Sequence, residues 1–248
     1  MKIFTSLALI GLLSTCAPSR PPTVEPGRDP LEFGTACLPF EAEKGVIFHY
    51  YRPHGKSKWR ENWTKALDLT GVSWTDECTA TLISPSHVVM AAHFKHPLNE
   101  PLTFHDKEGN PHERHIVAFR DLRSVGDVSV GKVNQALPKE IKFYQLADRR
   151  KAWVGKAVLV SDQTRTLNVH RIAAISNNSV HFKFLAGMHP VYRRNLVRGD
   201  SGHPSFICEN GQLTLLETHT TGGPGAGPFY GSPRVQAAVR AAMAELGD

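Results

Sequence analysis

Short segments rich in β-branched and aromatic residues recur along most of this chain, with turn-forming residues between them, and they constrain its fold more than any other feature. Many short strands in series predict an all-β fold built as a pair of barrels. The 248 residues are enough for two such units. We expect a loop over 53–65 and strands over 45–51, 79–84, 86–91, 114–119, 127–133, 156–161, 169–175, 179–185, 203–208 and 212–218.

The periodicity of the apolar residues changes near the C-terminus. Ser232 and Pro233 supply an N-cap and a first-turn proline, and Gly247 supplies a stop. Between them the apolar residues recur at helical spacing, namely Val235, Ala238, Val239, Ala242 and Leu246. The sequence therefore predicts a C-terminal α-helix.

The segment from Arg198 to Pro204 reads Arg-Gly-Asp-Ser-Gly-His-Pro. A tight glycine-rich turn of this kind can expose the Ser201 hydroxyl and direct consecutive backbone N–H groups at one point. A serine nucleophile needs both, because its hydroxyl requires a base and its tetrahedral product requires donors for the oxyanion. The alternative is a plain surface turn, since Gly, Asp and Ser all favour turns.

Two upstream segments contain the partners that such a serine needs. His93 follows the apolar run Val-Val-Met-Ala-Ala, and Asp127 precedes alternating apolar residues in Gly-Asp-Val-Ser-Val. An aspartate that accepts a hydrogen bond from the Nδ1–H of a histidine fixes its tautomer and stabilises the imidazolium. Taken singly, a histidine after a strand or an aspartate at a strand start is more often a structural residue.

In the order His, Asp, Ser, the three segments resemble the trypsin/chymotrypsin-like serine proteases over roughly residues 37–248, with some likeness to bacterial glutamyl endopeptidases. The resemblance implies two six-stranded antiparallel β-barrels, with the C-terminal helix packed on the second barrel. It implies His93 as general base, Asp127 as its orienting partner and Ser201 as nucleophile of an endopeptidase. The backbone N–H groups of Gly199 and Ser201 would form the oxyanion hole.

Other classes of protein explain the sequence less well. The α/β-hydrolase elbow needs Gly-x-Ser-x-Gly and the order Ser, Asp or Glu, His, but His203 occupies the last glycine position. A catalytically silent relative that acts as an envelope-tethered binding module remains as the alternative, although all three triad residues are present. A structural envelope protein would explain the N-terminal segment but not the three triad segments.

Specificity is predicted from the same resemblance. Asn195, six residues before Ser201, takes the place at the base of the primary pocket, where a trypsin-like preference for Lys or Arg would need an acid. His219 lies on the expected wall strand, as in glutamyl endopeptidases, and is a candidate ligand of an acidic side chain together with Arg198. Its alternative is a plain wall residue. His203 replaces the usual second glycine after the serine, so we expect a tighter loop or a partly occupied cleft.

The N-terminal segment predicts export. Lys2 precedes an apolar stretch from Ile3 to Leu13 that is too short to span a bilayer. Leu-Ser-Thr-Cys16 resembles a bacterial lipobox, so we expect a signal peptide over 1–15 and a lipidated Cys16 in the cell envelope. Ordinary cleavage near Ala17, with a secreted product, is the alternative. Residues 16–32 form a Pro-rich linker, and 33–248 the protease domain, with a first barrel over 37–140 and the second barrel and helix over 150–248.

The resemblance implies a protein or peptide substrate, and charge and composition indicate no nucleic acid as a partner. The chain carries a formal net charge of +6, but its basic residues are scattered and not interleaved with aromatics. The pairs His93-x-x-His96 and His112-x-x-His115 lack further ligands, so we expect neither a metal nor another cofactor. We expect a monomer.

Overall fold

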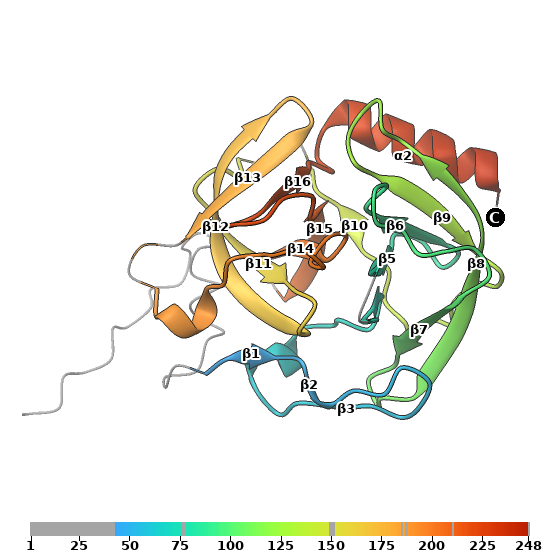
Figure 1. Ribbon diagram of the computed structural model, residues 1–248, viewed down its shortest axis with the longest axis horizontal. Coiled ribbons are helices and arrows are strands. Elements are labelled where there is room, and N and C mark those ends of the chain that lie inside the picture. Colours follow the sequence, from blue (N-terminus) through green and yellow to red (C-terminus); the bar gives the residue numbers. More distant parts are fainter. Residues whose placement is uncertain are drawn as a thin grey trace, which may run out of the picture.

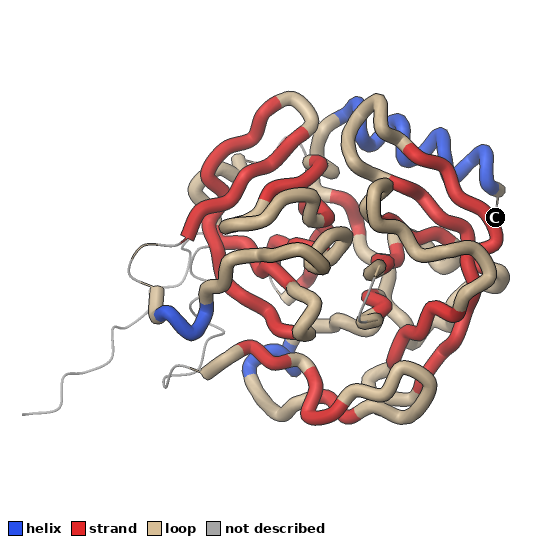
Figure 2. The backbone as a smooth tube through the Cα atoms, viewed as in Figure 1, coloured by secondary structure: helices blue, strands red, loops and turns tan. Residues whose placement is uncertain are grey.

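The computed structural model describes residues 43–75, 78–148, 152–184, 186, 188–209 and 211–247 (Figure 1). Within them the chain is mostly β-sheet with one C-terminal helix, as the sequence predicts. Figure 2 shows strands and loops alternating along almost the whole described chain. The predicted signal segment, the linker and Cys16 lie outside the described residues.

Six strands form a nearly closed antiparallel barrel, which confirms this part of the prediction. The two end strands, β4 and β7, approach each other without pairing. In sheet order the strands are β4 (Val72–Ser73), β5 (Ala80–Leu82), β6 (His87–Met90), β9 (Ser129–Val133), β8 (Pro111–Asp121) and β7 (Pro101–His105).

Strand β6 shows how the alternation of side chains builds two cores. Val88 and Met90 pack inside the barrel with Leu102 and Phe104. Val89 points the other way, into a larger cluster that also contains Phe206 and other residues of the second sheet. Both faces of β6 are therefore buried, because successive side chains of a strand point to opposite faces. This strand lies at the junction of the two halves of the molecule.

Eight further strands form a second sheet, which is not shown to close into a second barrel. Its β10 pairs with β15 in parallel, which departs from the antiparallel pairing expected. The strands are β10 (Gln145–Leu146), β15 (Gln212–Thr218), β14 (Pro204–Glu209), β11 (Ala157–Ser161), β12 (Thr166–Ser176), β13 (Ser179–Phe184) and β16 (Ala226–Pro228), with β1 (Gly45–Val46) added to β12.

The parallel pair has a physical reason. The chain that leads into β10 is still bound to the first barrel, because the Tyr144 amide donates to the carbonyl of Leu82. Two residues after β10 begins, the Ala147 amide donates to the carbonyl of Leu215. Strand β10 thus belongs to the segment that connects the two sheets. No hairpin joins it to β15, so the two strands are not required to be antiparallel.

Two assignments near the N-terminal end of the described chain need correction. Strand β1, placed by prediction in the first barrel, pairs instead with β12 of the second sheet. The expected loop over 53–65 contains the short strand β3 (Lys58–Trp59) and overlaps the 3₁₀ turn η1 (Trp63–Ala66). Strand β3 pairs with β2 (Phe48–Tyr50), where the rings of Phe48 and Trp59 stack at 4.4 Å. A second 3₁₀ turn, η2, spans Pro190–Tyr192.

The C-terminal helix α2 (Pro233–Leu246) forms as predicted but packs elsewhere. It lies against β8 and β9 of the first barrel, whereas the resemblance placed it on the second (Figure 1). Val235, Val239 and Ala242 are buried in the cluster between the two sheets, so the apolar face of the helix covers the junction rather than one sheet alone. Ser232 occupies the N-cap position, but its hydroxyl donates to the side chain of Asn178 instead of capping the helix.

Candidate active site

Ser201 lies in a tight turn directly before strand β14. Gly199 and Gly202 have φ values of 100° and 82°, in the left-handed region that side chains disfavour. Neither the Gly199 amide nor the Ser201 amide donates a hydrogen bond to any described residue. The turn therefore leaves these two N–H groups unused beside the serine, and they are the pair that the sequence proposed as oxyanion donors.

The Asp200 carboxylate lies beneath this turn and is 1% exposed. Its Oδ2 accepts a hydrogen bond of 2.6 Å from the amide of Val197, and its Oδ1 accepts one of 3.0 Å from the amide of Gln163. A buried carboxylate needs such donors, and bonds to an ionised acceptor are among the stronger ones in proteins. The turn is thus held from inside by its own aspartate.

His93 and Asp127 come together because His93 follows strand β6, Asp127 precedes strand β9, and these two strands are paired. Strand β6 ends at Met90, opposite Ser129 at the start of β9, so the next residues of one strand meet the preceding residues of the other. The Oδ1 of Asp127 accepts from the His93 amide at 2.9 Å, and its Oδ2 contacts the Nδ1 of the ring. An aspartate with this double contact fixes both the backbone and the ring of His93.

The second ring nitrogen of His93 reaches the serine. Its Nε2 lies 2.9 Å from the Oγ of Ser201, which comes from the other half of the molecule. An ionised carboxylate only accepts, so the proton of a neutral His93 resides on Nδ1 and its Nε2 is an acceptor for the Ser201 hydroxyl. The His93 side chain is 42% exposed and that of Asp127 is 16% exposed. The structure thus brings the three predicted triad residues together in the order Asp127, His93, Ser201.

His203 points away from the cleft. It is fully buried, and its Nε2 lies 2.9 Å from the Oγ1 of Thr79, while its amide donates to the carbonyl of Asp200. Burial lowers the pKa of His203 to about 4, so the ring is neutral at pH 7. Its backbone amide closes the turn, and because its ring is buried against Thr79 it does not occupy the cleft.

A cavity of about 80 Å³ opens beside the serine. Of the three predicted specificity residues, His219 and Arg198 line it, whereas Asn195 is exposed and not among its lining residues. The next residue, Leu196, is buried and pairs with Gly223 through two backbone hydrogen bonds of 2.7 and 3.0 Å. This pairing fixes the backbone beside Asn195, whose own side chain is exposed. The cavity is lined by Val197, Arg198, Asp200, Ser201, His219, Thr220, Thr221 and Gly222.

The ring of His219 is engaged within the protein. It is 1% exposed, its Nε2 lies 2.9 Å from the carbonyl of Ser161, and its Nδ1 lies 2.7 Å from a carboxylate oxygen of Glu217. The second contact is an ion pair that lacks the alignment of a good hydrogen bond. Burial lowers the pKa of His219, but the Glu217 carboxylate outweighs burial and raises it. Neither ring nitrogen is left to bind a substrate carboxylate, so the wall-residue alternative describes His219 better.

The described residues offer no evident cation site and no membrane helix. No group of three or more His, Cys, Asp or Glu side chains among them is placed to hold a metal ion. His112 lies 3.3 Å from a carboxylate oxygen of Asp106, and His115 contacts the carbonyl of Asn99. Within the same residues, none of the helices has the length and apolar character needed to cross a bilayer.

Comparison with known proteins adds no assignment: no model of a protein family matches the chain, and a search of curated proteins finds no significant match. The geometry of the site therefore stands by itself. Sequence reasoning missed two contributors to it, Glu217 and Gln163. Glu217 had a signal, because residues two apart on a strand share a face and it precedes His219 by two. Gln163 lies in the turn between β11 and β12 and had none.

Proposed function

We propose that this chain is a trypsin-like serine endopeptidase that hydrolyses peptide bonds through an acyl-enzyme on Ser201. The observation that supports this most is the continuous series of contacts from Asp127 through both ring nitrogens of His93 to the Ser201 hydroxyl. His93 and Asp127 come from the first barrel and Ser201 from the second sheet. Their meeting depends on the whole fold, which makes chance proximity a poor explanation.

In the proposed mechanism His93 Nε2 accepts the hydroxyl proton as Ser201 Oγ attacks the carbonyl carbon of the substrate. The N–H groups of Gly199 and Ser201 bind the oxyanion of the tetrahedral intermediate. His93 then gives the proton to the leaving amine, and an ester on Ser201 remains. Water attacks the ester with His93 as base, which releases the acid and restores the serine. Asp127 orients the ring and stabilises its charged form, without taking the proton itself.

We also interpret part of the second sheet as the second barrel of that fold. The antiparallel run β15-β14-β11-β12-β13-β16 contains six strands, and its two end strands lie close together. The Tyr230 amide, two residues after β16, donates to the carbonyl of Leu216 in β15. On this interpretation β1 and β10 are additions to a six-stranded antiparallel barrel, and the site lies between the two barrels.

The cavity beside Ser201 suggests where to look for substrates. Its volume is small, and Arg198 adds an exposed cation at its edge, within reach of a carboxylate that does not enter the cavity fully. We propose Arg198 rather than His219 as the residue that meets an acidic side chain. Peptide libraries with Glu and with Ala at the primary position test the proposal. A role for this cation would be refuted if the parent cleaves Glu peptides no faster than Ala peptides. It would also be refuted if Arg198→Ala cleaves Glu peptides as fast as the parent does.

We propose export as well, with Cys16 lipidated in a cell envelope or cleavage near Ala17 and secretion. Mass spectrometry of the mature N-terminus separates the two. A diacylglyceryl mass on Cys16 supports the tethered form, and a chain that begins near Ala17 supports the secreted one. A chain that retains residues 1–15 in its native host would refute both.

The decisive experiment for the activity is covalent labelling of the full chain with a fluorophosphonate, which reacts with activated serine hydroxyls. We expect labelling of the parent, none of Ser201→Ala, and unchanged labelling of Ser176→Ala, whose serine is exposed at the end of β12. Asp127→Asn should label far more slowly, because it favours the wrong tautomer of His93. Absence of labelling in a folded parent refutes the hydrolase and favours the silent binding module.

A further inference from the structure

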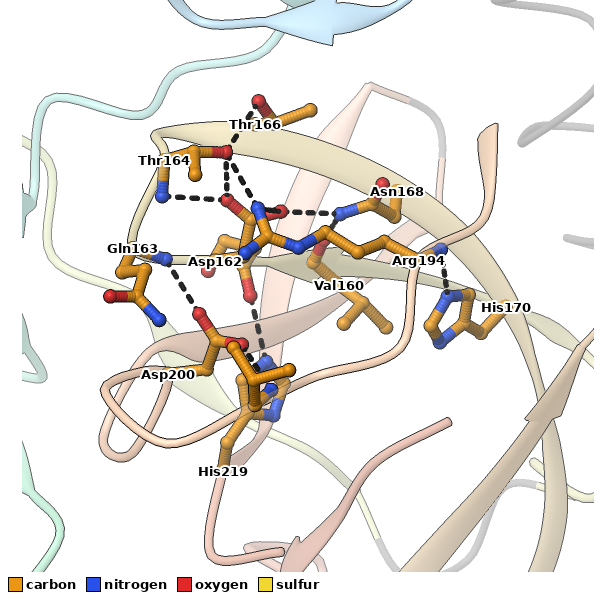
Figure 3. A network of polar contacts seen from close by, with 12 residues as sticks. Val160, Asp162, Gln163, Thr164, Thr166, Asn168, His170, Arg194, Asp200 and His219 are labelled. Carbon is orange, nitrogen blue, oxygen red and sulfur yellow. Dashed lines mark hydrogen bonds and ion pairs between the residues drawn. The ribbon is translucent and has the colours of Figure 1, made fainter. Parts of the chain in front are cut away.

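The turn between β11 and β12 is held rigidly by one buried carboxylate. Asp162 is fully buried, and its Oδ1 accepts from the amide and the hydroxyl of Thr164 at 2.8 and 2.5 Å. Its Oδ2 accepts from the side chain of Asn168 at 2.9 Å and pairs with Arg194 at 3.1 Å. Figure 3 shows Asp162 at the centre of these contacts. The next residue, Gln163, is therefore presented from a fixed backbone.

Gln163 contacts the turn of Ser201 at two points. Its amide donates to Asp200 Oδ1, a contact visible in Figure 3, and its side-chain Nε2 donates to the carbonyl of Arg198 at 2.9 Å. The side chain also lies against Gly199, where a Cβ would come within 2.6 Å of Gln163 Oε1. One residue thus holds both the carboxylate beneath the turn and the peptide group that contains the Gly199 amide.

That second contact has a directional consequence. The carbonyl of Arg198 and the N–H of Gly199 belong to one planar trans peptide group, so they point in opposite directions. Gln163 binds the carbonyl from one side, and the N–H is thereby directed to the other. Glycine permits either orientation of this peptide, because positive and negative φ are nearly equally accessible to it. Next to Gly199, at φ 100°, the peptide group therefore relies on a partner of the Arg198 carbonyl to keep one of the two orientations.

We propose that Gln163 is a positioning residue for the oxyanion hole, whose side-chain amide fixes the direction of the Gly199 N–H. The inference rests on the proposed hydrolase function and deepens it. Gln163 touches no reacting atom, so truncating its side chain should leave substrate binding intact. It should weaken only the interaction that develops when the carbonyl oxygen of the substrate becomes an oxyanion.

The test compares Gln163→Ala with Gln212→Ala, a change of the same kind at an exposed hairpin residue. The alanine keeps the backbone N–H to Asp200 and removes the side-chain amide, which includes the Nε2 donor. We expect its fluorophosphonate labelling rate and its kcat to fall about 10- to 100-fold with KM unchanged. The upper limit follows because complete loss of one oxyanion donor costs about 10²–10³. A peptide aldehyde bound to Ser201 places an oxygen where the oxyanion of the intermediate lies. Its affinity for Gln163→Ala should therefore fall by the same factor as kcat/KM.

Gln163→Glu provides the second variant, since it keeps the shape and places an oxygen against the Arg198 carbonyl. It should be at least as slow as the alanine variant, with an unfolding midpoint near that of the parent. Equal rates in Gln163→Ala and the parent would overturn the inference, as would a loss that appears in KM alone. An unlabelled parent would refute the proposed hydrolase, and this role with it, whereas a labelled parent with an unaffected variant refutes only the role of Gln163.

Discussion

Replacing Asp200 by asparagine should destabilise the protein and disorder the turn of Ser201. The carboxylate accepts one hydrogen bond on each oxygen, from the amides of Val197 and Gln163, and has 1% exposure. An asparagine has one acceptor oxygen, so its NH₂ group must face one of these two donors. The variant therefore loses one bond to a charged acceptor and leaves one of these partly buried backbone N–H groups without its partner in the protein.

The magnitude follows from these two losses. A hydrogen bond to a charged group contributes about 1.5–3 kcal/mol, and an unsatisfied donor that is only partly buried costs at the lower end of the range of about 1–3 kcal/mol. Because asparagine no longer buries a charge, part of this cost is offset. We expect a net decrease of about 2–4 kcal/mol in the free energy of unfolding.

Urea unfolding followed by tryptophan fluorescence measures this change, with Ser201→Ala as the common background so that self-cleavage does not interfere. Glu140→Gln removes the same charge from an exposed position and should stay within about 0.5 kcal/mol of the background. The reasoning is refuted if Asp200→Asn is as stable as Glu140→Gln. It is also refuted if Asp200→Asn, made in the chain that retains Ser201, labels with fluorophosphonate at the parental rate.

Three further changes test other parts of the structure. The folded-state pKa of His219 lies above the usual 6.5. Its pair with Glu217 should therefore stabilise the fold fully below about pH 6.5, and progressively less as pH rises through the folded-state pKa. The difference in melting temperature between the parent and Glu217→Gln should shrink over that range, and a constant difference would contradict the pairing. Gly202→Ala should cost about 1–2 kcal/mol in urea unfolding, since φ is 82° and its Cβ would lie 3.2 Å from the Thr79 carbonyl; an unchanged midpoint would disprove the strain. Phe104→Ala should cost about 3–5 kcal/mol by leaving a cavity in the barrel core, and a cost under about 1 kcal/mol would mean that the barrel collapses around it.

Most strands were predictable from their local composition, including the short strands β5 and β6, but several strands of two residues were not. The segment 212–218 coincides with β15, and 156–161 differs from β11 by one residue. Strands β3, β4 and β10 have two residues each, which is too short to show any periodicity. Strand β7 was missed although it has five residues, because it starts with Pro101 and ends with a buried histidine, His105.

Partner choice between distant segments lay beyond the sequence. Nothing in Gly45–Val46 distinguishes pairing with β12 from pairing within the first barrel, since two residues satisfy either ladder. The apolar stripe of α2 predicted that the helix packs on something apolar, and both halves of the molecule supply such a surface. The pairing of β1 and the packing of α2 depend on how much apolar surface the whole core buries, and a local sequence pattern does not determine that.

Part of the candidate site was likewise predictable from the sequence and part was not. The residue types and order of His93, Asp127 and Ser201 were readable from three short segments, and the structure brings these residues into contact. The predicted use of His219 depended on the direction of its ring nitrogens. A pattern of residues does not determine that direction, because the partners are a carbonyl of another strand and a carboxylate two residues away.

Three histidines surround the turn of Ser201, and their surroundings separate their roles. His203 is buried without a carboxylate contact, and burial lowers its pKa to about 4, so its ring is neutral at pH 7. His219 is equally buried, but any charge it carries is paired with Glu217. Neither places an uncompensated charge beside the serine. His93 combines a carboxylate on one nitrogen, the Ser201 hydroxyl on the other and a side chain open to solvent. A substrate that enters the cleft can therefore reach the imidazole that is already bound to the nucleophile, while the other two imidazoles shape the turn that holds it.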